Sequence, residues 1–216
     1  MSRKHTACTA SIVIPILFIL WTVAVRTIGR QPVGPLDSTI GLSRLNIRVH
    51  NAIGVHLFLY NLTDFLSLLP LGIMALNAVN GLMQWIRRKD LRKVDRTIIA
   101  LGLLYAVLFT VFITFELFPV NFRPVLIEGK LEASYPSSTT MLALSVMILE
   151  VQKIRLTYRK TRARRVAEIG LLTFGMFMVI ARILSGVHWI TDIIGGLLIC
   201  GSLAAWYTYI TDKGAR

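Results

Sequence analysis

Long apolar segments separated by shorter polar ones make up most of the chain. The apolar segments comprise residues 8–25, a stretch within residues 55–86, and residues 97–118, 138–151, 166–184 and 189–210. A helix needs about 20 mostly apolar residues to cross a membrane, and most of these segments approach that length. The pattern therefore predicts an all-α, polytopic membrane protein with six transmembrane helices, in a single domain that covers residues 1–216.

Two regions of the pattern predict more than a simple crossing. Residues 55–86 are longer than one span, and Thr63 and Asp64 form a plausible helix start, which would place Asp64 near the outer end of a helix. Residues 28–54 form the first outer loop and are broken by glycine and proline. Their second half, residues 40–54, mixes apolar and basic positions, which favours an amphipathic helix on the outer surface of the membrane.

The composition supports a membrane protein and excludes several other classes. Hydrophobic residues make up 55% of the chain and charged residues 16%, whereas about a quarter of a soluble domain is charged. Disordered, collagen-like and disulfide-rich secreted proteins are excluded by this composition. Cys8 and Cys200 both lie in apolar segments and predict no disulfide framework.

Basic residues predict the orientation. The chain has 24 Lys and Arg residues against 11 Asp and Glu residues, for a net charge of +13. With the N-terminus inside, 17 of these basic residues fall in inside segments and 7 on the outer side, as the positive-inside rule requires. We therefore expect both termini in the cytoplasm, a bacterial plasma membrane as the location, and the lipid bilayer, not nucleic acid, as the partner of this charge.

The first apolar segment has two interpretations. It follows Arg3 and Lys4, as the apolar core of a signal peptide follows basic residues, but no small-x-small cleavage site comes after it. We expect it to be retained as a helix. The sequence makes no prediction of the oligomeric state.

Polar residues collect at the outer ends of the later helices, in residues 121–137 and 181–192. Ionisable residues near membrane depth are costly, which makes a functional site the default hypothesis. His188 and Asp192 are four residues apart and share one helix face. A carboxylate at that spacing fixes the imidazole tautomer and leaves the other nitrogen free to attack; the simpler alternative is an interfacial histidine bonded to a capping aspartate.

Two arginines and a serine-rich turn add groups that suit an anion. Arg123 and Arg182 carry planar guanidinium groups that bind phosphate oxygens in pairs, although each would also suit a side chain that reaches up to lipid headgroups. Ser137 and Ser138 follow a proline at the start of a predicted helix, where hydroxyl and free N–H groups bind anions or simply cap the helix.

The order and spacing of these residues are more specific than any one of them. The three blocks are Arg123-Pro124, Pro136-Ser137 and Arg182-x5-His188-x3-Asp192. This arrangement resembles the type 2 phosphatidic acid phosphatase family, whose core is shared with vanadium haloperoxidases. The resemblance implies the helical bundle of that family and a metal-independent enzyme, without a cofactor, that removes phosphate from membrane lipid phosphates or diphosphates.

The resemblance also implies a role for each motif residue. His188 would attack phosphorus and become a phosphohistidine, and Asp192 would orient it. Arg123 and Arg182 would neutralise the transferring phosphoryl group. Ser137 and the backbone around Ser138 would complete the phosphate cradle.

Three positions depart from the family pattern. Glu116 stands where the family has a lysine, seven residues before the arginine of the first block. Thr139 stands where the family has the histidine that protonates the leaving group, and Ala181 replaces a serine. We expect Glu116 either to contact the bound phosphate, which it would repel unless paired or protonated, or to face the headgroup region away from the substrate.

The loss of the acid at Thr139 has three interpretations. In the first, the leaving group needs little help, which favours prenyl diphosphates over phosphatidic acid. In the second, another group supplies the proton. In the third, the protein has weak or no catalysis and binds phosphorylated lipids or acts as a membrane scaffold. General acids contribute about 10²–10⁴-fold. The candidate replacements are Glu116, Glu128, Glu132, His50 and His56. We predict a lipid phosphatase with its site on the outer face, and regard a transporter or a haloperoxidase as less favoured.

Overall fold

A computed structural model describes residues 3–212 of the chain, and nearly all of them belong to a bundle of helices. The helices are α1 (Arg3–Thr27), α2 (Ser43–Ile53), α3 (Leu57–Leu66), α4 (Leu68–Arg88), α5 (Arg96–Leu117), α6 (Ser138–Thr157), α7 (Arg162–Leu184) and α8 (Ile190–Thr211). Two short strands, β1 (Gln31–Pro32) and β2 (Thr39–Ile40), pair antiparallel in the connection between α1 and α2. The all-α class is thus correct.

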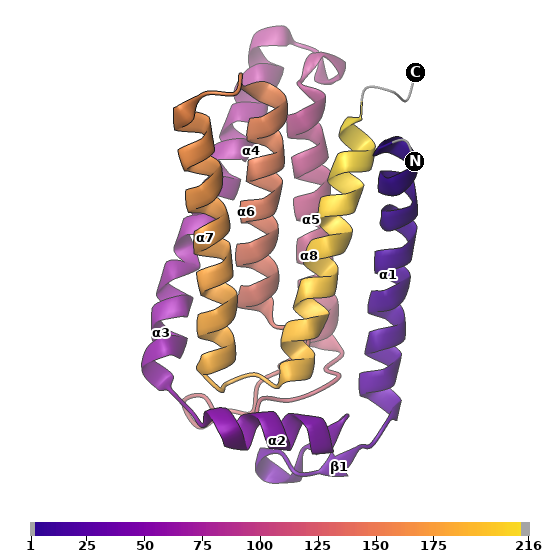
Figure 1. The fold of residues 1–216 in the computed structure, drawn as a ribbon, viewed down its shortest axis with the longest axis vertical. Coiled ribbons are helices and arrows are strands. Elements are labelled where there is room, and N and C mark those ends of the chain that lie inside the picture. Colours follow the sequence, from indigo (N-terminus) through magenta and orange to yellow (C-terminus); the bar gives the residue numbers. More distant parts are fainter. Residues whose placement is uncertain (1–2, 213–216) are drawn as a thin grey trace.

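Five helical segments of the described chain are long and apolar enough to cross a membrane. They are His5–Thr27, Leu57–Arg88, Arg96–Leu117, Arg162–Leu184 and Ile190–Thr211. The sixth predicted crossing is present as α6, but this helix is less apolar because its second half carries Glu150, Lys153 and Arg155. Helix α6 lies in the interior of the bundle, among α5, α7 and α8 (Figure 1). A polytopic membrane fold is confirmed, and a sixth span stays a prediction.

The predicted helix start at Thr63 and Asp64 is wrong. Helix α3 begins at Leu57, and Thr63 lies inside it, with its hydroxyl bonded to the Leu59 carbonyl at 2.8 Å. The chain breaks instead between α3 and α4, just before Pro70. Proline has no N–H to donate to the carbonyl four residues earlier and crowds that turn, which explains why one long apolar segment becomes two helices.

Helix α2 crosses the ends of the other helices instead of continuing one of them. It lies transverse to α7 and α8 at one end of the bundle (Figure 1). The Asn46 side chain, which is fully buried, donates to the Gly41 carbonyl at 2.8 Å and to the Thr191 hydroxyl at 3.0 Å. The predicted amphipathic helix of residues 40–54 is therefore present and is fixed to the start of α8.

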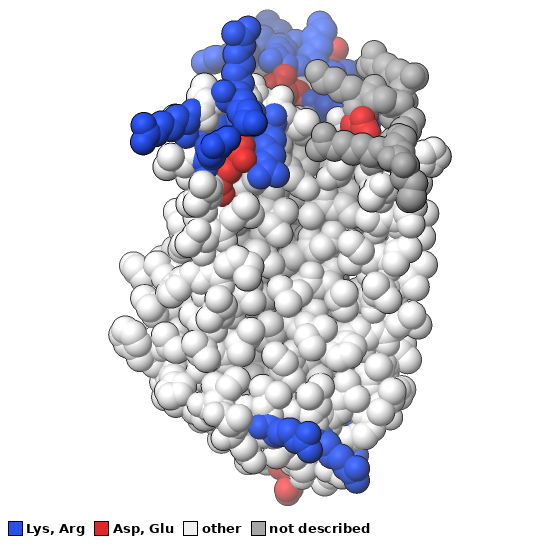
Figure 2. All heavy atoms as spheres, in the orientation of Figure 1, with Lys and Arg blue, Asp and Glu red and all other residues white. Residues whose placement is uncertain are grey.

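The two ends of the bundle differ in charge. Lys and Arg side chains gather over the end where α1 begins and α8 ends, which we call the basic end (Figure 2). The opposite end carries α2, residues 118–137 and the turn between α7 and α8, and we call it the loop end (Figure 1). The polar residues singled out in the sequence lie at the loop end.

Close packing at the loop end depends on Gly195. A Cβ atom at this position would lie 2.7 Å from the ring of Tyr135. Tyr135 is buried, and its hydroxyl pairs with that of Thr22 at 2.7 Å. Gly195 thus lets α8 approach the 118–137 loop and α1, as the Gly195-Gly196 pair in the sequence suggests.

Candidate active site

The turn between α7 and α8 places His188 at the loop end. Helix α7 ends at Leu184, and Gly186 then adopts a left-handed conformation with φ of 65°. A Cβ atom at Gly186 would lie 1.8 Å from the carbonyl oxygen of Gly54, so no other residue fits this close approach. The turn is thereby held against the start of α3, and the side chain of His188 is buried.

The first turn of α8 places Asp192 beside His188. Trp189 caps the helix, and its N–H donates to Oδ2 of Asp192 at 2.9 Å. The indole N–H of Trp189 donates to the Phe122 carbonyl at 2.7 Å, which ties the turn to the loop of the Arg-Pro pair. Two segments more than 60 residues apart in the sequence are joined in this way.

His188 is held through one ring nitrogen and free at the other. Its Nδ1 lies 3.1 Å from the Ser134 carbonyl and 3.7 Å from Oδ2 of Asp192. Ser134 also donates its hydroxyl to Oδ2 of Asp192. A carbonyl only accepts, which assigns the proton to Nδ1. Nε2 is buried and has no hydrogen-bond partner among the described residues, so its lone pair is available.

Electrostatics favour the neutral, nucleophilic imidazole. Burial lowers the pKa of His188 well below its ordinary value of 6.5, and the positive charges of Arg182 and Arg123 lower it further. The bond to the Ser134 carbonyl opposes this shift but is the smaller effect. A neutral imidazole with a free nitrogen is the state that attacks phosphorus.

Arg182 is a buried cation anchored by α3. Its side chain is 1% exposed; NH1 donates to the Thr63 hydroxyl at 3.0 Å, and NH2 lies 3.9 Å from Oδ1 of Asp64. The guanidinium carbon lies 4.6 Å from the centre of the Tyr60 ring. Its Nε has no hydrogen-bond partner within the described chain.

Arg123 reaches the same aromatic ring from the other side of the site. Its guanidinium carbon lies 5.5 Å from the Tyr60 ring centre. Its Nε forms an ion pair with Oε2 of Glu132 at 3.1 Å, but the N–H bond does not point at this oxygen, so the pair is not a hydrogen bond. Its NH1 is buried and has no hydrogen-bond partner among residues 3–212. Two guanidinium groups, each with an unpaired N–H, therefore meet at Tyr60.

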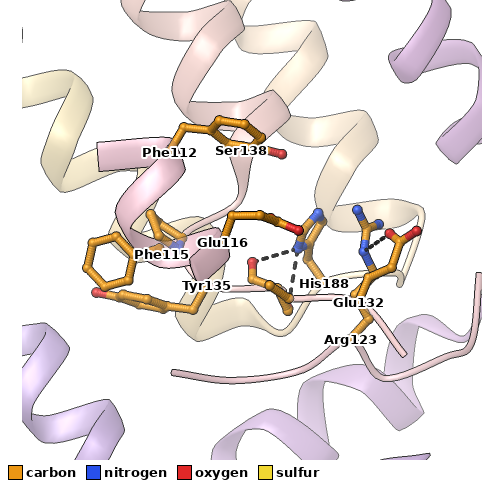
Figure 3. A pocket seen from close by; sticks show the side chains of 11 residues that line it. Phe112, Phe115, Glu116, Arg123, Glu132, Tyr135, Ser138 and His188 are labelled. Atoms are coloured by element: carbon orange, nitrogen blue, oxygen red, sulfur yellow. Dashed lines mark hydrogen bonds and ion pairs between the residues drawn. The ribbon is translucent and has the colours of Figure 1, made fainter. Parts of the chain in front are cut away.

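A cavity of about 240 Å³ opens beside these residues. Its walls comprise Phe112, Phe115, Glu116, Arg123, Glu132, Ala133, Ser134, Tyr135, Pro136, Ser138 and His188. Figure 3 shows the side chains of Glu116, Arg123, Glu132 and His188 around it. We call this cavity the phosphate pocket after the ligand that the sequence resemblance implies; His188 and Arg123, each with an unpaired nitrogen, both line it.

The structure brings together some of the predicted site residues and separates others. His188, Arg123, Ser138 and Glu116 line the phosphate pocket, and Asp192 and Arg182 are buried against that group. The expectation that Glu116 faces away from the site is therefore not met, since its side chain points into the pocket (Figure 3).

Ser137 and Thr139 do not line the phosphate pocket. The Ser137 hydroxyl donates to that of Thr140 at 3.0 Å, and its N–H donates to the Asp192 carbonyl at 3.1 Å. Thr139 lines a separate, mostly apolar cavity of about 290 Å³ beside Leu142. The first turn of α6 directs successive side chains to different faces, which explains why Ser138 lines the phosphate pocket and Thr139 does not.

The roles of three residues of the site are not apparent in the sequence. Ser134 bonds both His188 and Asp192, Tyr60 supports both arginines, and Glu132, a candidate acid, pairs with Arg123. Ser134 and Tyr60 lie far from their partners in the sequence, and Glu132 meets Arg123 through the path of their shared loop, so spacing along the chain does not reveal these contacts. Within the described part of the chain, no three His, Cys, Asp or Glu side chains form a group able to hold a metal.

The second part of this membrane protein is similar to a known family. Residues 118–216 match the model of the PAP2 superfamily, and they include all three motif blocks. The resemblance predicted from the sequence is thus confirmed.

Comparison with solved structures extends the similarity to the whole fold. The chain is similar to the structure described as the first transmembrane PAP2 type phosphatidylglycerolphosphate phosphatase from Bacillus subtilis, with a TM-score of 0.63 and 16% identity. The similarity covers 95% of this chain and 97% of that one. At this identity it establishes the fold. A comparison with curated proteins found no match.

Proposed function

We propose that this protein is a metal-independent phosphatase of membrane lipid phosphates or diphosphates that acts through a phosphohistidine. The observation that carries the proposal is the unpaired Nε2 of His188 beside a pocket lined by Arg123, which has unpaired N–H donors, as has Arg182, buried nearby at the same Tyr60 ring. Buried polar groups without partners are rare in folded proteins, and a tetrahedral anion would satisfy all of these at once.

The first chemical step follows from the geometry of His188. Its Nε2 lone pair forms a bond to phosphorus, and the bond from phosphorus to the leaving oxygen breaks. The imidazole then carries a positive charge, which Asp192 and the Ser134 carbonyl stabilise at Nδ1. Water attacks the phosphohistidine in the second step and returns the electron pair to Nε2.

Arg123 and Arg182 stabilise the charge that spreads over the equatorial oxygens. Phosphoryl transfer depends mainly on positioning and on electrostatic stabilisation. Both groups are preorganised, because Glu132, Asp64, Thr63 and the Tyr60 ring hold them before substrate arrives. Ser138 at the start of α6 completes the cradle.

Prenyl diphosphates are the favoured substrates. Thr139 supplies no acid and lies outside the phosphate pocket, and a phosphate is a better leaving group than a lipid alkoxide. Phosphatidic acid is the second candidate, and phosphatidylglycerolphosphate, named in the description of the Bacillus subtilis structure, is the third.

The distribution of charge supports a location in a bacterial plasma membrane with all six long helices crossing it, α6 included. The basic end would face the cytoplasm together with both termini, and the phosphate pocket would face outward (Figure 2). Helix α2 would then lie at the outer surface.

Phosphate release by the purified protein tests the proposal. We expect wild-type protein to release phosphate from at least one of the three lipids, and His188→Ala to release none. His5→Ala is the matched control, since His5 is exposed at the far end of α1. Equal rates for wild type and His188→Ala would refute the mechanism.

A binding protein with weak or no catalysis is the second candidate. It is favoured by Glu116 in the pocket and by the absence of an acid at Thr139. If Thr139→His creates phosphate release where wild-type protein has none, the natural protein is such a binder.

A further inference from the structure

We propose that Glu116 protonates the leaving oxygen and so performs the task that the residue at position 139 cannot. This inference rests on the phosphatase activity proposed above and identifies one more catalytic residue for it. It does not rest on the preference for diphosphates, because an acid at Glu116 would also serve phosphatidic acid. It follows from which acids the structure brings to the phosphate pocket and from what each of them contacts there.

Only two acidic side chains of the described residues line the phosphate pocket, Glu116 and Glu132. The other candidates are placed elsewhere. Glu128 is exposed in the turn between residues 127 and 130, His56 bonds the Ile53 carbonyl at 3.0 Å, and His50 lies against Trp189 outside the pocket. The location of each side chain in the fold therefore reduces the five candidate acids to Glu116 and Glu132.

Glu132 is already engaged. Its Oε2 lies 3.1 Å from Nε of Arg123. A side chain that holds a phosphate-binding arginine in place is poorly suited to serve the leaving oxygen as well.

Glu116 has the opposite surroundings. It extends from the last turn of α5 into the pocket (Figure 3), where its side chain is exposed, and no hydrogen bond or ion pair joins it to another residue of the described chain. The other charged groups around the pocket are Arg123 and Glu132, with the neutral His188 beside them and Arg182 buried nearby.

Glu116 is the carboxyl group of the pocket that no cation of the described chain engages, whereas Arg123 already pairs with Glu132. In the proposed reaction the substrate enters as a monoanion. Its proton passes through the Glu116 carboxyl group to the leaving oxygen.

The step balances without any further reactant. Nε2 of His188 forms the bond to phosphorus, the electron pair of the broken bond goes to the leaving oxygen, and that oxygen takes the proton of the Glu116 carboxyl group. The resulting carboxylate then accepts a proton from the water that hydrolyses the phosphohistidine. Lipid alcohol, or lipid phosphate from a diphosphate, is the product of the first step, and inorganic phosphate is the product of the second.

A leaving-group series separates this role from all others. Release of the leaving group in the first turnover of purified Glu116→Gln would be measured with phosphatidic acid, whose alkoxide must be protonated, and with a prenyl diphosphate and 4-nitrophenyl phosphate, whose leaving oxygens are stable as anions. General acid catalysis is worth about 10²–10⁴-fold, so we expect a loss of that size with phosphatidic acid and losses under about tenfold with the diphosphate and the aryl ester.

Matched variants keep the outcome interpretable. Glu128→Gln, an equivalent change outside the pocket, should leave all three rates unchanged, and trapping of the phosphoenzyme from the aryl ester shows that Glu116→Gln is folded. An equal loss on all three substrates, or no loss on any, overturns the role of Glu116. His188→Ala should lose all three activities; if it keeps them, or if wild type has none, the proposed function itself fails.

Discussion

Two groups of buried polar side chains lie in one bundle, one toward the basic end and one at the loop end. The first joins Glu150 and Lys153 of α6 to Asn77 of α4 and Tyr105 of α5. Lys153 donates to Asn77 at 2.7 Å and pairs with Glu150, and Asn77 donates to Glu150 at 3.0 Å and to the Tyr105 hydroxyl at 3.3 Å. Every charged group in it has a partner from the protein.

The group at the loop end is built from similar residue types but is incomplete. Nε2 of His188, NH1 of Arg123 and Nε of Arg182 are buried without hydrogen-bond partners among the described residues. Burial of polar groups near membrane depth is costly in both places. The comparison shows that the first group is complete within the protein, whereas the second leaves donors and a lone pair open, as a site that binds the proposed ligand would.

Replacement of Arg182 tests the loop-end half of this contrast and has the largest expected effect. Arg182→Gln removes a preorganised cation, and we expect kcat for lipid phosphate hydrolysis to fall by about 10²–10³-fold. The melting temperature should stay the same or rise, because a buried and partly unpaired charge is lost. Steady-state kinetics and thermal unfolding in the same detergent measure both quantities; a large fall in melting temperature would contradict the contrast.

Replacement of Glu150 tests the other half. Glu150→Ala leaves the Lys153 ammonium without its counter-charge inside the bundle, and we expect the free energy of unfolding to fall by about 3 kcal/mol, the lower end for such pairs because both side chains retain slight exposure. The specific activity of the folded protein should change little. Arg155→Gln is the control, since its exposed pair with Glu168 is worth under about 1 kcal/mol.

Replacement of Tyr60 tests what its aromatic ring contributes to the group at the loop end. The ring face supports both guanidinium groups, and each cation–π contact is worth about 0.5–2 kcal/mol. Tyr60→Leu should therefore lower kcat/KM by about tenfold, whereas Tyr60→Phe keeps the ring and should match wild type. Similar losses in the two variants would assign the effect to the hydroxyl instead.

The smallest expected effect is on the way the free energy of unfolding depends on pH. Burial lowers the pKa values of both His188 and His50 below 6.5, so the unfolded chain binds protons that the folded chain does not. Stability from these groups is therefore complete above pH 6.5 and declines as the pH falls toward about 5. Melting temperatures across this range measure the slope, and His188→Asn should flatten it; an unchanged slope would show that the imidazole is not buried in its neutral form.

The sequence predicts relations within one helix well and relations between loops poorly. His188 and Asp192 share a helix face at a spacing of four, and the structure has them together. Ser134 and Tyr60 reach His188 and the arginines only because the Trp189 indole bonds the Phe122 carbonyl and because Gly186 packs on Gly54. Nothing in the local pattern encodes such contacts, since they depend on the path of the whole chain.

The helices show the same division. Apolar length predicts where most of them lie. The chain breaks just before Pro70, and the predicted helix start at Thr63 and Asp64 is too early, because a Thr-Asp pair looks the same in sequence whether it caps a helix or lies inside one. The charged second half of α6 is explained only by its partners on α4 and α7, which are Asn77 and Glu168. A helix in the middle of a bundle finds its polar partners in the protein and needs less apolar surface than one that faces lipid.

The corner formed by Gly54 and Gly186 has a consequence for evolution and for library design. Main-chain atoms of Gly54 set how closely the α7–α8 turn, which carries His188, approaches the start of α3, which carries Tyr60. Gly186 is confined by crowding, whereas Gly54 has open space around it but a backbone conformation, φ of 74° and ψ of −165°, that L-residues avoid. A saturation library should recover glycine at both sites for unlike reasons, and a D-alanine placed at 54 by chemical synthesis should be accommodated.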